Sequence, residues 1–423
     1  MSELKVGTIV SLTNGSTCKV KKELGRGGQG IVYLAEVGGK DMALKWYHKE
    51  PSTNIDGFYK NLKNNASSGA PSPAFIWPKY VTNKQYDSFG YIMDLRPQGY
   101  YEFSLFLIAK QKFSNFFART TAAMEICEGF KALHARGLSY QDLNDGNFFI
   151  DPRTGHVKIC DNDNAFPNGQ KSGVLGKARY MAPEVVVGET LPNAYSDKFS
   201  LSVILFMLFY GNHPFEGKKV VSAPCLTEAH EKKFFGTEPV FICDPVNNSN
   251  PPIRGIHTNV IKCWPLLPAK LRNVFVEEFG KNKLLSPTKR FTEQQWLDTI
   301  TIIRDSLVHC PHCGEETFVN NKCLNCGNDI KVTNTLIVNN RILPIIKGNK
   351  LYLNRDDIPD LQVVYDSNNP SNLYLRNLTP DIIIVDTTKG TTKQVETQGI
   401  MPVKTGLTLH IKVCGTMYKC EIK

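Results

Sequence analysis

The sequence predicts an α+β protein in which a small β-rich lobe precedes a larger helical lobe, followed by a four-cysteine zinc ribbon and a small all-β sandwich. Strand-like stretches occupy about residues 5–100, and apolar residues at helical spacing dominate from about residue 112 to 305. Clustered cysteines then separate these lobes from a second set of short strand-like stretches. The expected domain boundaries are 1–100, 101–306, 307–330 and 331–423.

The individual elements follow from local patterns. The first strand candidates are CKVKKELG, GIVYLAEV and KDMALKWY, and a helical candidate, IDGFYKNLKNN, precedes the breaker SSGAPSP. Residues 116–137 combine helical spacing with a closing glycine, and a further helical stretch ends in WLDTITIIRDSL. Beyond residue 330, short strands broken by Gly, Asn and Pro predict the sandwich: NTLIVNN, NKLYLN, DIIIVD, LTLHIKV and MYKCEI.

The composition is that of a soluble globular protein, with 41% hydrophobic and 21% charged residues among 423. The N-terminus has no apolar stretch of a signal peptide, and the longest apolar run, FSLSVILFMLFY, is too short to span a bilayer. We therefore expect a cytoplasmic protein without a membrane partner. The net charge of +10 comes from scattered Lys and Arg, so nucleic-acid binding is a weaker alternative.

A glycine-rich stretch near the N-terminus predicts a phosphate-binding loop. Gly25, Gly27 and Gly30 form a GxGxxG pattern in LGRGGQGIVYLAE, and glycines let backbone amides approach a phosphate closely. A strand follows the glycines, which disfavours a dinucleotide-binding loop, since that loop opens a helix. Lys45, fifteen residues after Gly30, lies near the end of the next strand, where its ammonium group could reach the phosphates.

Two polar motifs follow in the helical lobe. In YQDLNDGN, Asp142 precedes Asn147 by five residues, and Asp161 begins the motif DND after a short strand. Together with the glycine loop and Lys45, these motifs resemble those of the eukaryotic-like (Hanks-type) serine/threonine protein kinases, over roughly residues 7–305. The resemblance also covers the run MAPE ending at Glu184, and it implies a bilobal protein-kinase-like fold.

The resemblance implies a role for each matching residue. Asp142 would accept the proton of a substrate hydroxyl, and Asn147 and Asp161 would hold magnesium across the ATP phosphates. Met93 would guard the adenine pocket, and the backbone of residues 94–96 would bond the adenine edge. The implied ATP-binding residues are Leu24, Gly25, Gly27, Gly30, Val32, Ala43, Lys45, Met93, Asp94, Leu95, Asn147 and Asp161. Three further residues would be structural, Asp197 bracing the catalytic loop and Glu184 pairing with Arg290.

The sequence departs from the family pattern around the catalytic loop. Tyr140 and Gln141 replace the usual His-Arg pair, so the arginine that grips an activation-loop phosphate is missing, and between Asp161 and Glu184 only Ser172 could carry such a phosphate. Activation-loop phosphorylation is therefore not the expected switch.

A second departure places Asn144 where serine/threonine kinases carry a lysine. We hypothesise that Lys177, in the segment before the Pro-Glu motif, reaches back to Asp142 and the γ-phosphate as a catalytic cation. The alternative is that Lys177 points to solvent.

Two further features of the family pattern are altered: the DFG motif, whose Asp binds metal, and the glutamate on a helix that normally pairs with the strand lysine. DFG is replaced by Asp161-Asn162-Asp163, in which Asp163 could be a second metal contact or a turn cap. The acidic residue that normally pairs with Lys45 is not evident; Asp56 is one candidate, and the phosphates alone are another. Because the groups that touch metal and nucleophile are retained, we interpret the chain as an active kinase. Its expected substrates are Ser and Thr hydroxyls of a protein, including its own. The alternative is an ATP-binding pseudokinase scaffold that recruits partners through its zinc ribbon and sandwich.

Four cysteines predict a structural zinc site. Cys310 and Cys313 form one CxxCG turn, and Cys323 and Cys326 form a second, with nine residues between the pairs. Each turn aims two thiolates at one point, and four such ligands make a closed tetrahedral site. The neighbouring His309 and His312 are surplus to this site, and we expect both to face solvent.

The C-terminal strands resemble a forkhead-associated (FHA) type sandwich, although the phosphothreonine-binding pattern of that family is not evident. The combination of kinase, zinc ribbon and β domain resembles bacterial kinases that work beside a metal-dependent protein phosphatase and a von Willebrand A-type protein. That resemblance implies a protein substrate, these two partners, and ATP, Mg²⁺ (or Mn²⁺) and structural Zn²⁺ as cofactors.

Overall fold

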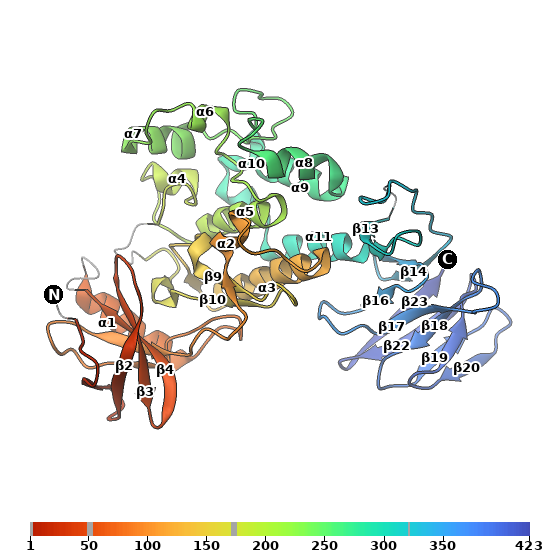
Figure 1. The fold of residues 1–423 in the computed structure, drawn as a ribbon, viewed down its shortest axis with the longest axis horizontal. Helices are drawn as coiled ribbons and strands as arrows, with labels where there is room; N and C mark the ends of the chain where they lie inside the picture. Colours follow the sequence, from red (N-terminus) through yellow and green to blue (C-terminus); the bar gives the residue numbers. More distant parts are fainter. Residues whose placement is uncertain (1–2, 49–53, 171–175, 320–321) are drawn as a thin grey trace.

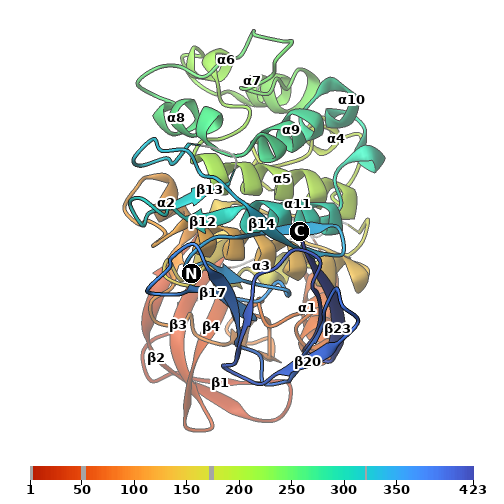
Figure 2. The ribbon, with the colours of Figure 1, turned by 90° about the vertical axis from the view of Figure 1, so that its right-hand side faces the viewer.

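The computed structural model describes residues 3–48, 54–170, 176–319 and 322–423. The chain forms an N-terminal β-rich lobe, a central helical lobe and a C-terminal β sandwich (Figure 1). The two β-rich parts lie on different sides of the helical lobe, and the sandwich adjoins the helices α3 and α11 (Figures 1 and 2). Among the residues just given, no helix is both long and apolar enough to cross a membrane.

The N-terminal lobe is a six-stranded antiparallel sheet with one helix packed against it. Its strands, in spatial order, are β1 (Ile9–Ser11), β2 (Thr17–Arg26), β3 (Gly30–Val37), β4 (Lys40–Tyr47), β6 (Gly90–Met93) and β5 (Tyr80–Val81). Helix α1 (Ile55–Ser68) begins at Asn54, whose side chain accepts a hydrogen bond from the amide of Gly57. The weak helical pattern at IDGFYKNLKNN therefore predicted a real helix.

The helical lobe is built around α3 (Phe116–Ala135) and α5 (Ala194–Tyr210). Helix α5 starts with a capping box between Asn193 and Ser196 and stops at Gly211, which has a left-handed backbone with φ +67°. Nearly every residue of α5 is buried, which explains why its sequence is apolar all round. The other helices are α2 (Phe103–Leu107), α4 (Pro183–Val186), α6 (Lys218–Val221), α7 (Glu228–Glu231), α8 (Thr258–Leu266), α9 (Ala269–Glu278), α10 (Lys281–Leu284) and α11 (Glu293–Asp305).

Short strands and short helical turns lie between the helices of this lobe and flank its loops. Strands β7 (Tyr101–Glu102), β9 (Phe148–Ile150) and β10 (Val157–Ile159) form one small sheet, and β8 (Leu138–Ser139) pairs with β11 (Phe166–Pro167). These strands flank the two loops that carry the candidate catalytic and metal-binding residues. The single turns are η1 (Asp145–Asn147), η2 (Asn162–Asn164), the π-helical η3 (Lys232–Thr237) and η4 (Pro287–Lys289).

A four-cysteine ribbon and the sandwich follow α11 directly. The ribbon contains the hairpin β12 (Leu307–His309) and β13 (Glu316–Phe318). The sandwich has two antiparallel sheets that enclose one apolar core. The larger sheet has the order β15 (Arg341–Ile345), β14 (Asn334–Val338), β23 (Thr416–Ile422), β22 (Thr408–Val413), β19 (Ile383–Asp386), β20 (Thr392–Val395); the smaller has β16 (Lys350–Leu351), β17 (Leu361–Tyr365), β18 (Leu373–Asn377), β21 (Ile400–Pro402).

Charged contacts attach the sandwich to the helical lobe. The buried guanidinium of Arg304, at the end of α11, donates hydrogen bonds of 2.7–2.9 Å to the backbone carbonyls of residues 354–356. Arg341 of β15 forms a two-pronged ion pair with Asp305, at 2.7 Å for each bond. Two-pronged arginine contacts fix both distance and orientation, so these bonds set how the sandwich sits on the lobe.

Candidate active site

The candidate catalytic carboxylate, Asp142, lies in the loop between β8 and η1. The amide of Asn144 donates to its Oδ1 at 3.2 Å, and the oxygen of Asn144 in turn accepts from Lys177 Nζ at 3.3 Å. Burial raises the pKa of Asp142 to about 6, and the nearby Asp161 adds to that rise, while Asn144 and Lys177 oppose it. A half-buried carboxylate with this pKa can accept a proton near neutral pH.

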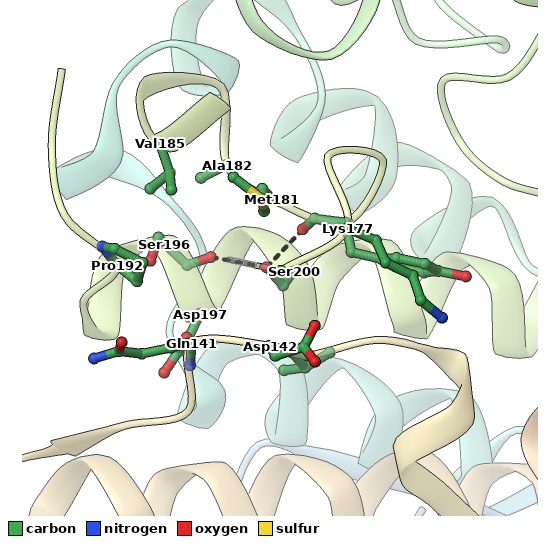
Figure 3. Close-up of a pocket in the computed structure, with 13 residues that line it drawn as sticks. Gln141, Asp142, Lys177, Met181, Ala182, Val185, Pro192, Ser196, Asp197 and Ser200 are labelled. Carbon is green, nitrogen blue, oxygen red and sulfur yellow. Dashed lines mark hydrogen bonds between the residues drawn. The ribbon is translucent and has the colours of Figure 1, made fainter. Parts of the chain in front are cut away.

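Lys177 is close to Asp142 but is connected to it through Asn144. Both Lys177 and Asp142 line one pocket between the catalytic loop and α5 (Figure 3). Ser200 of α5 lines the same pocket, and its hydroxyl donates to the carbonyls of Tyr180 and Ser196 (Figure 3). The ammonium of Lys177 donates to the side chain of Asn144 in the catalytic loop, and its role in catalysis stays a prediction.

Asn147 is oriented by the residue that replaces the usual histidine of the catalytic loop. Its amide nitrogen donates to the hydroxyl of Tyr140 at 2.9 Å and to the backbone carbonyl of Asp142 at 3.0 Å. Tyr140 is completely buried, and its hydroxyl donates to the carbonyl of Cys160, next to Asp161. Because both donors of the Asn147 amide are used in this way, its oxygen is the atom left to ligate a cation.

Asp197 braces the catalytic loop from α5, as the sequence predicts. Its carboxylate accepts from the backbone amides of Tyr140 at 2.6 Å and of Gln141 at 3.4 Å. The ring of His134, near the end of α3, lies between Asp197, at 3.0 Å, and Glu293 of α11, at 2.7 Å. Three helices therefore fix the backbone immediately before Asp142.

Lys45 is buried on β4 and forms ion pairs with both acids of the DND motif. Its ammonium is 2.9 Å from Asp163 Oδ2 and 3.3 Å from Asp161 Oδ1, and it also donates to Gln29 of the glycine loop at 3.1 Å. Burial alone would lower the pKa of Lys45, but the carboxylates of Asp163 and Asp161 raise it above its ordinary value. Lys45 is therefore a permanent cation at the position where phosphates are expected.

The structure corrects two expectations about the acids near Lys45. Asp56, considered as its partner, is at the exposed start of α1, with 91% of its side chain accessible, and pairs with Lys84. Asp163, considered as a metal ligand or turn cap, has a completely buried side chain directed at Lys45. Position in the sequence could not reveal this, because Asp163 reaches Lys45 through the left-handed backbone of Asp161 (φ +54°).

The predicted adenine-binding residues gather at the edge of the sheet. Ala43 pairs across β4 and β6 with Met93, both are buried, and Val32 and Leu95 pack against the same cluster. Phe149 of β9 joins this cluster from the helical lobe, and the sequence analysis missed it because one phenylalanine in an apolar stretch carries no distinctive signal. Two other predicted residues lie outside the cluster: Leu24 is 46% exposed on β2, and the carboxylate of Asp94 pairs with Lys79 at 2.7 Å.

The glycine loop has the features of a phosphate cradle. A Cβ atom at Gly25 or Gly27 would meet nothing within 4 Å, so these glycines leave the backbone open. Gly30 is required by packing instead, because a Cβ there would lie 2.3 Å from the carbonyl of Trp46. The loop therefore has a bare backbone at Gly25 and Gly27, and its Gln29 side chain contacts Lys45.

The oxygens of Asp161 and Asn147 are of the chemical type that magnesium requires. The carboxylate of Asp161 is 44% exposed, and the oxygen of Asn147 comes from the adjacent loop. Both are hard oxygen ligands of the kind that Mg²⁺ uses, together with waters and substrate phosphates.

The four cysteines of the ribbon fit zinc. All four Sγ atoms lie within 4.8 Å of one another, and the separations between the turns are 3.7 Å for Cys310–Cys326 and 3.6 Å for Cys313–Cys323. Tetrahedral coordination with Zn–S bonds of about 2.3 Å requires Sγ separations of about 3.8 Å. His309 is exposed, as expected for a residue outside the site.

Comparison with known proteins agrees with this geometry. Residues 18–237 match the model of the protein kinase domain, which covers half of the chain. The chain belongs to the protein kinase family. It is 32% identical over 226 residues to protein kinase C delta type of Mus musculus, and 29% identical over 210 residues to beta-adrenergic receptor kinase 1 of Didelphis virginiana. These matches cover 50% and 47% of this chain but only 32% and 30% of the relatives, so the chain spans about a third of their length.

The family resemblance also predicts a buried ion pair in the helical lobe. Arg290 donates two hydrogen bonds of 2.7 Å to Glu184, and only 1% of the arginine side chain is exposed. The predicted structural pair is therefore present. Ser172, the one serine between Asp161 and Glu184, lies in segment 171–175, outside the described residues.

Proposed function

We propose that this chain is a protein serine/threonine kinase that transfers the γ-phosphate of ATP to a hydroxyl of a protein substrate, including a hydroxyl of its own. The observations that support the proposal are the ion pair between Lys45 and Asp161 and the hydrogen bond from Asn147 to the backbone of Asp142, within a protein kinase domain. The pseudokinase alternative was supported by the lack of an evident acidic residue on a helix to pair with Lys45. The ion pair between Lys45 and Asp163 weakens that support, because the lysine has a buried carboxylate partner.

The residues divide the reaction as follows. Asp142 orients the substrate hydroxyl and accepts its proton as the hydroxyl oxygen bonds to the γ-phosphorus and the bond to ADP breaks. Lys45 binds phosphate oxygens beneath the glycine loop. Asn147 and Asp161 would hold Mg²⁺, which neutralises charge on the phosphates when bound. Lys177, linked to the loop through Asn144, adds positive charge beside the transferred group.

The zinc ribbon and the sandwich are proposed to serve recognition and attachment rather than chemistry. A closed four-cysteine site leaves no open coordination position for a substrate. Two sheets around one core are compatible with an FHA-like sandwich and with a partner-binding role. The resemblance to bacterial kinases supports a metal-dependent protein phosphatase and a von Willebrand A-type protein as partners.

The test is phosphoryl transfer from labelled ATP with Mg²⁺ or Mn²⁺, to the chain itself and to a generic protein acceptor. Asp142→Asn and Asp161→Asn are expected to lower transfer by about 10²-fold or more, because they remove the proton acceptor and a metal ligand. Asp298→Asn, on the exposed face of α11, is the control and should transfer like wild type. ATP binding without transfer in the wild type would favour the pseudokinase scaffold instead.

A further inference from the structure

Asp163 is a buried carboxylate that the expected phosphotransfer roles do not account for. None of its side chain is exposed, and its two oxygens lie 3.0 and 2.9 Å from Lys45 Nζ. It belongs to the short turn η2, two residues after the candidate metal ligand Asp161. A buried charge is costly unless it is paired and hydrogen-bonded, so this arrangement requires explanation.

Two tyrosine hydroxyls complete the surroundings of this carboxylate. Tyr47 donates to Asp163 Oδ2 at 2.7 Å, and Tyr91 donates to Oδ1 at 3.0 Å. Tyr47 lies two residues after Lys45 on β4, on the same face, and Tyr91 is the cross-strand partner of Lys45 on β6. The three side chains therefore converge on Asp163 from one face of the sheet, and each oxygen accepts from both the ammonium and a hydroxyl.

Helix α1 does not provide an acid for Lys45. Its one acidic residue, Asp56, is exposed and paired with Lys84. On its buried face, the amides of Asn61 and Asn65 both donate to the carbonyl of Ala165, at 2.8 and 2.9 Å. The helix is thus hydrogen-bonded to the segment after the DND motif and not to the lysine.

We propose that Asp163 is the positioning residue for Lys45, and that the metal-binding turn takes over the task that a helix acid performs in other protein kinases. This inference rests on the proposed kinase function and identifies how that site is held together. Asp161 and Asp163 lie in one turn, and Asp163 holds Lys45. The position of this turn therefore fixes the positions of the metal ligand and of the lysine at the same time. Moving the turn outward would separate Asp163 from Lys45 and would leave the buried ammonium group and the hydroxyls of Tyr47 and Tyr91 without this carboxylate, so the assembled state is favoured.

The contacts of Lys45 fit this division of roles. The contacts to Asp161, at 3.3 Å, and to Gln29, at 3.1 Å, involve groups on the open side of the site. Asp163 lies on the closed side, behind the lysine, and its side chain is entirely buried. Phosphate oxygens can replace the two open-side contacts while Asp163 continues to hold the ammonium group.

The decisive experiment is a double-mutant cycle of Asp163→Asn and Lys45→Ala, measuring kcat, KM for ATP and the Kd of MgATP in all four proteins. We expect Asp163→Asn alone to weaken MgATP binding by about 10-fold and to lower kcat/KM by about 10–100-fold. In the Lys45→Ala background the same change should alter the Kd by less than about twofold, because residues that act as a unit are not additive. Equal effects in both backgrounds would show a merely structural role and overturn the proposal.

Further variants guard against a failure of Asp163→Asn to fold. Tyr91→Phe removes one hydroxyl that holds Asp163 while keeping the ring, and it should weaken MgATP binding severalfold in the presence of Lys45 only. Asp56→Ala is the matched control in α1, and its Kd and kcat should equal those of wild type; a loss there would return the role to the helix.

The outcome separates this inference from the proposed function. If the wild type transfers no phosphate, the kinase proposal fails, but the Kd values still decide whether Asp163 acts through Lys45. If transfer occurs and the cycle is additive, the kinase proposal stands and the Asp163 inference fails.

Discussion

His134 lies between two carboxylates beneath the catalytic loop, and its protonation should contribute to the stability of the helical lobe. Its ring contacts Asp197 and Glu293, and only 10% of the side chain is exposed. Burial would lower the pKa of His134, but the hydrogen bonds and charges of Asp197 and Glu293 outweigh burial and raise it to about 9. The imidazolium form is therefore the native one at neutral pH.

The sign and size of the effect follow from linkage. Since the folded pKa of His134 is above the unfolded value of about 6.5, its contribution is complete below about pH 6.5 and is lost as the pH rises through about 9. Between about pH 7 and about pH 10 this amounts to a loss on the order of 2.5 kcal/mol in the free energy of unfolding. His134→Gln should remove this pH-dependent part, because glutamine does not titrate.

Urea unfolding at a series of pH values measures this contribution, with tryptophan fluorescence reporting on the helical lobe through the fully buried Trp296. The difference between wild type and His134→Gln cancels the other titrating groups. His156→Gln is the matched control, since His156 also pairs with a carboxylate, Glu125, but is 40% exposed. We expect its effect to stay below about 1 kcal/mol. Parallel pH profiles for wild type and His134→Gln would refute the reasoning.

Three other predictions concern the zinc site, the buried ion pair and the candidate cation. Chelation or Cys310→Ser should release one metal ion per chain and lower the thermal midpoint, whereas the exposed Cys414→Ser should do neither; an unchanged midpoint would exclude a structural site. Glu184→Gln should cost about 3–5 kcal/mol in urea unfolding, because its arginine partner is left buried without a counter-charge. Asp298→Asn, in an exposed pair, should cost below about 1 kcal/mol, and equal losses would contradict the distinction. Lys177→Ala should lower kcat severalfold with little change in KM for ATP, and an unchanged kcat would show that its charge does not act in phosphoryl transfer.

The order of motifs was enough to predict the architecture of the kinase domain. Glycine spacing, a strand lysine and the pair Asp142 and Asn147 are local patterns, and each has its expected structural surroundings. The cysteine spacing was equally local, because each CxxCG turn is formed by five consecutive residues. Helix α1 was predicted more weakly, since its interior carries several asparagines and a glycine, and tertiary packing compensates for their low helix propensity.

The partner of Lys45 could not be predicted, because it depends on contacts between distant segments. Asp163 is 118 residues from Lys45, and its approach requires the left-handed turn at Asp161 and two tyrosines on separate strands. The role of Tyr140 could not be predicted for the same reason. Its hydroxyl contacts the amide of Asn147 and the carbonyl of Cys160, and only the fold brings these two residues together. The sequence shows which positions of a known motif are substituted. The contacts that take the place of the lost ones, such as Asp163 with Lys45, are visible only in the structure.

Helix α3 connects the zinc ribbon to the catalytic brace, and its packing argues for a structural rather than a regulatory link. At its start, the carboxylate of Glu316, in β13 of the ribbon, accepts from the backbone amides of Phe116 and Phe117. At its other end, His134 contacts Asp197. These ends are about 30 Å apart, given 20 helical residues at about 1.5 Å each. A signal along this path would need an element with two stable positions, whereas α3 is buried along most of its length. Zinc loss should therefore loosen the ribbon and lower stability while leaving kcat per folded molecule unchanged.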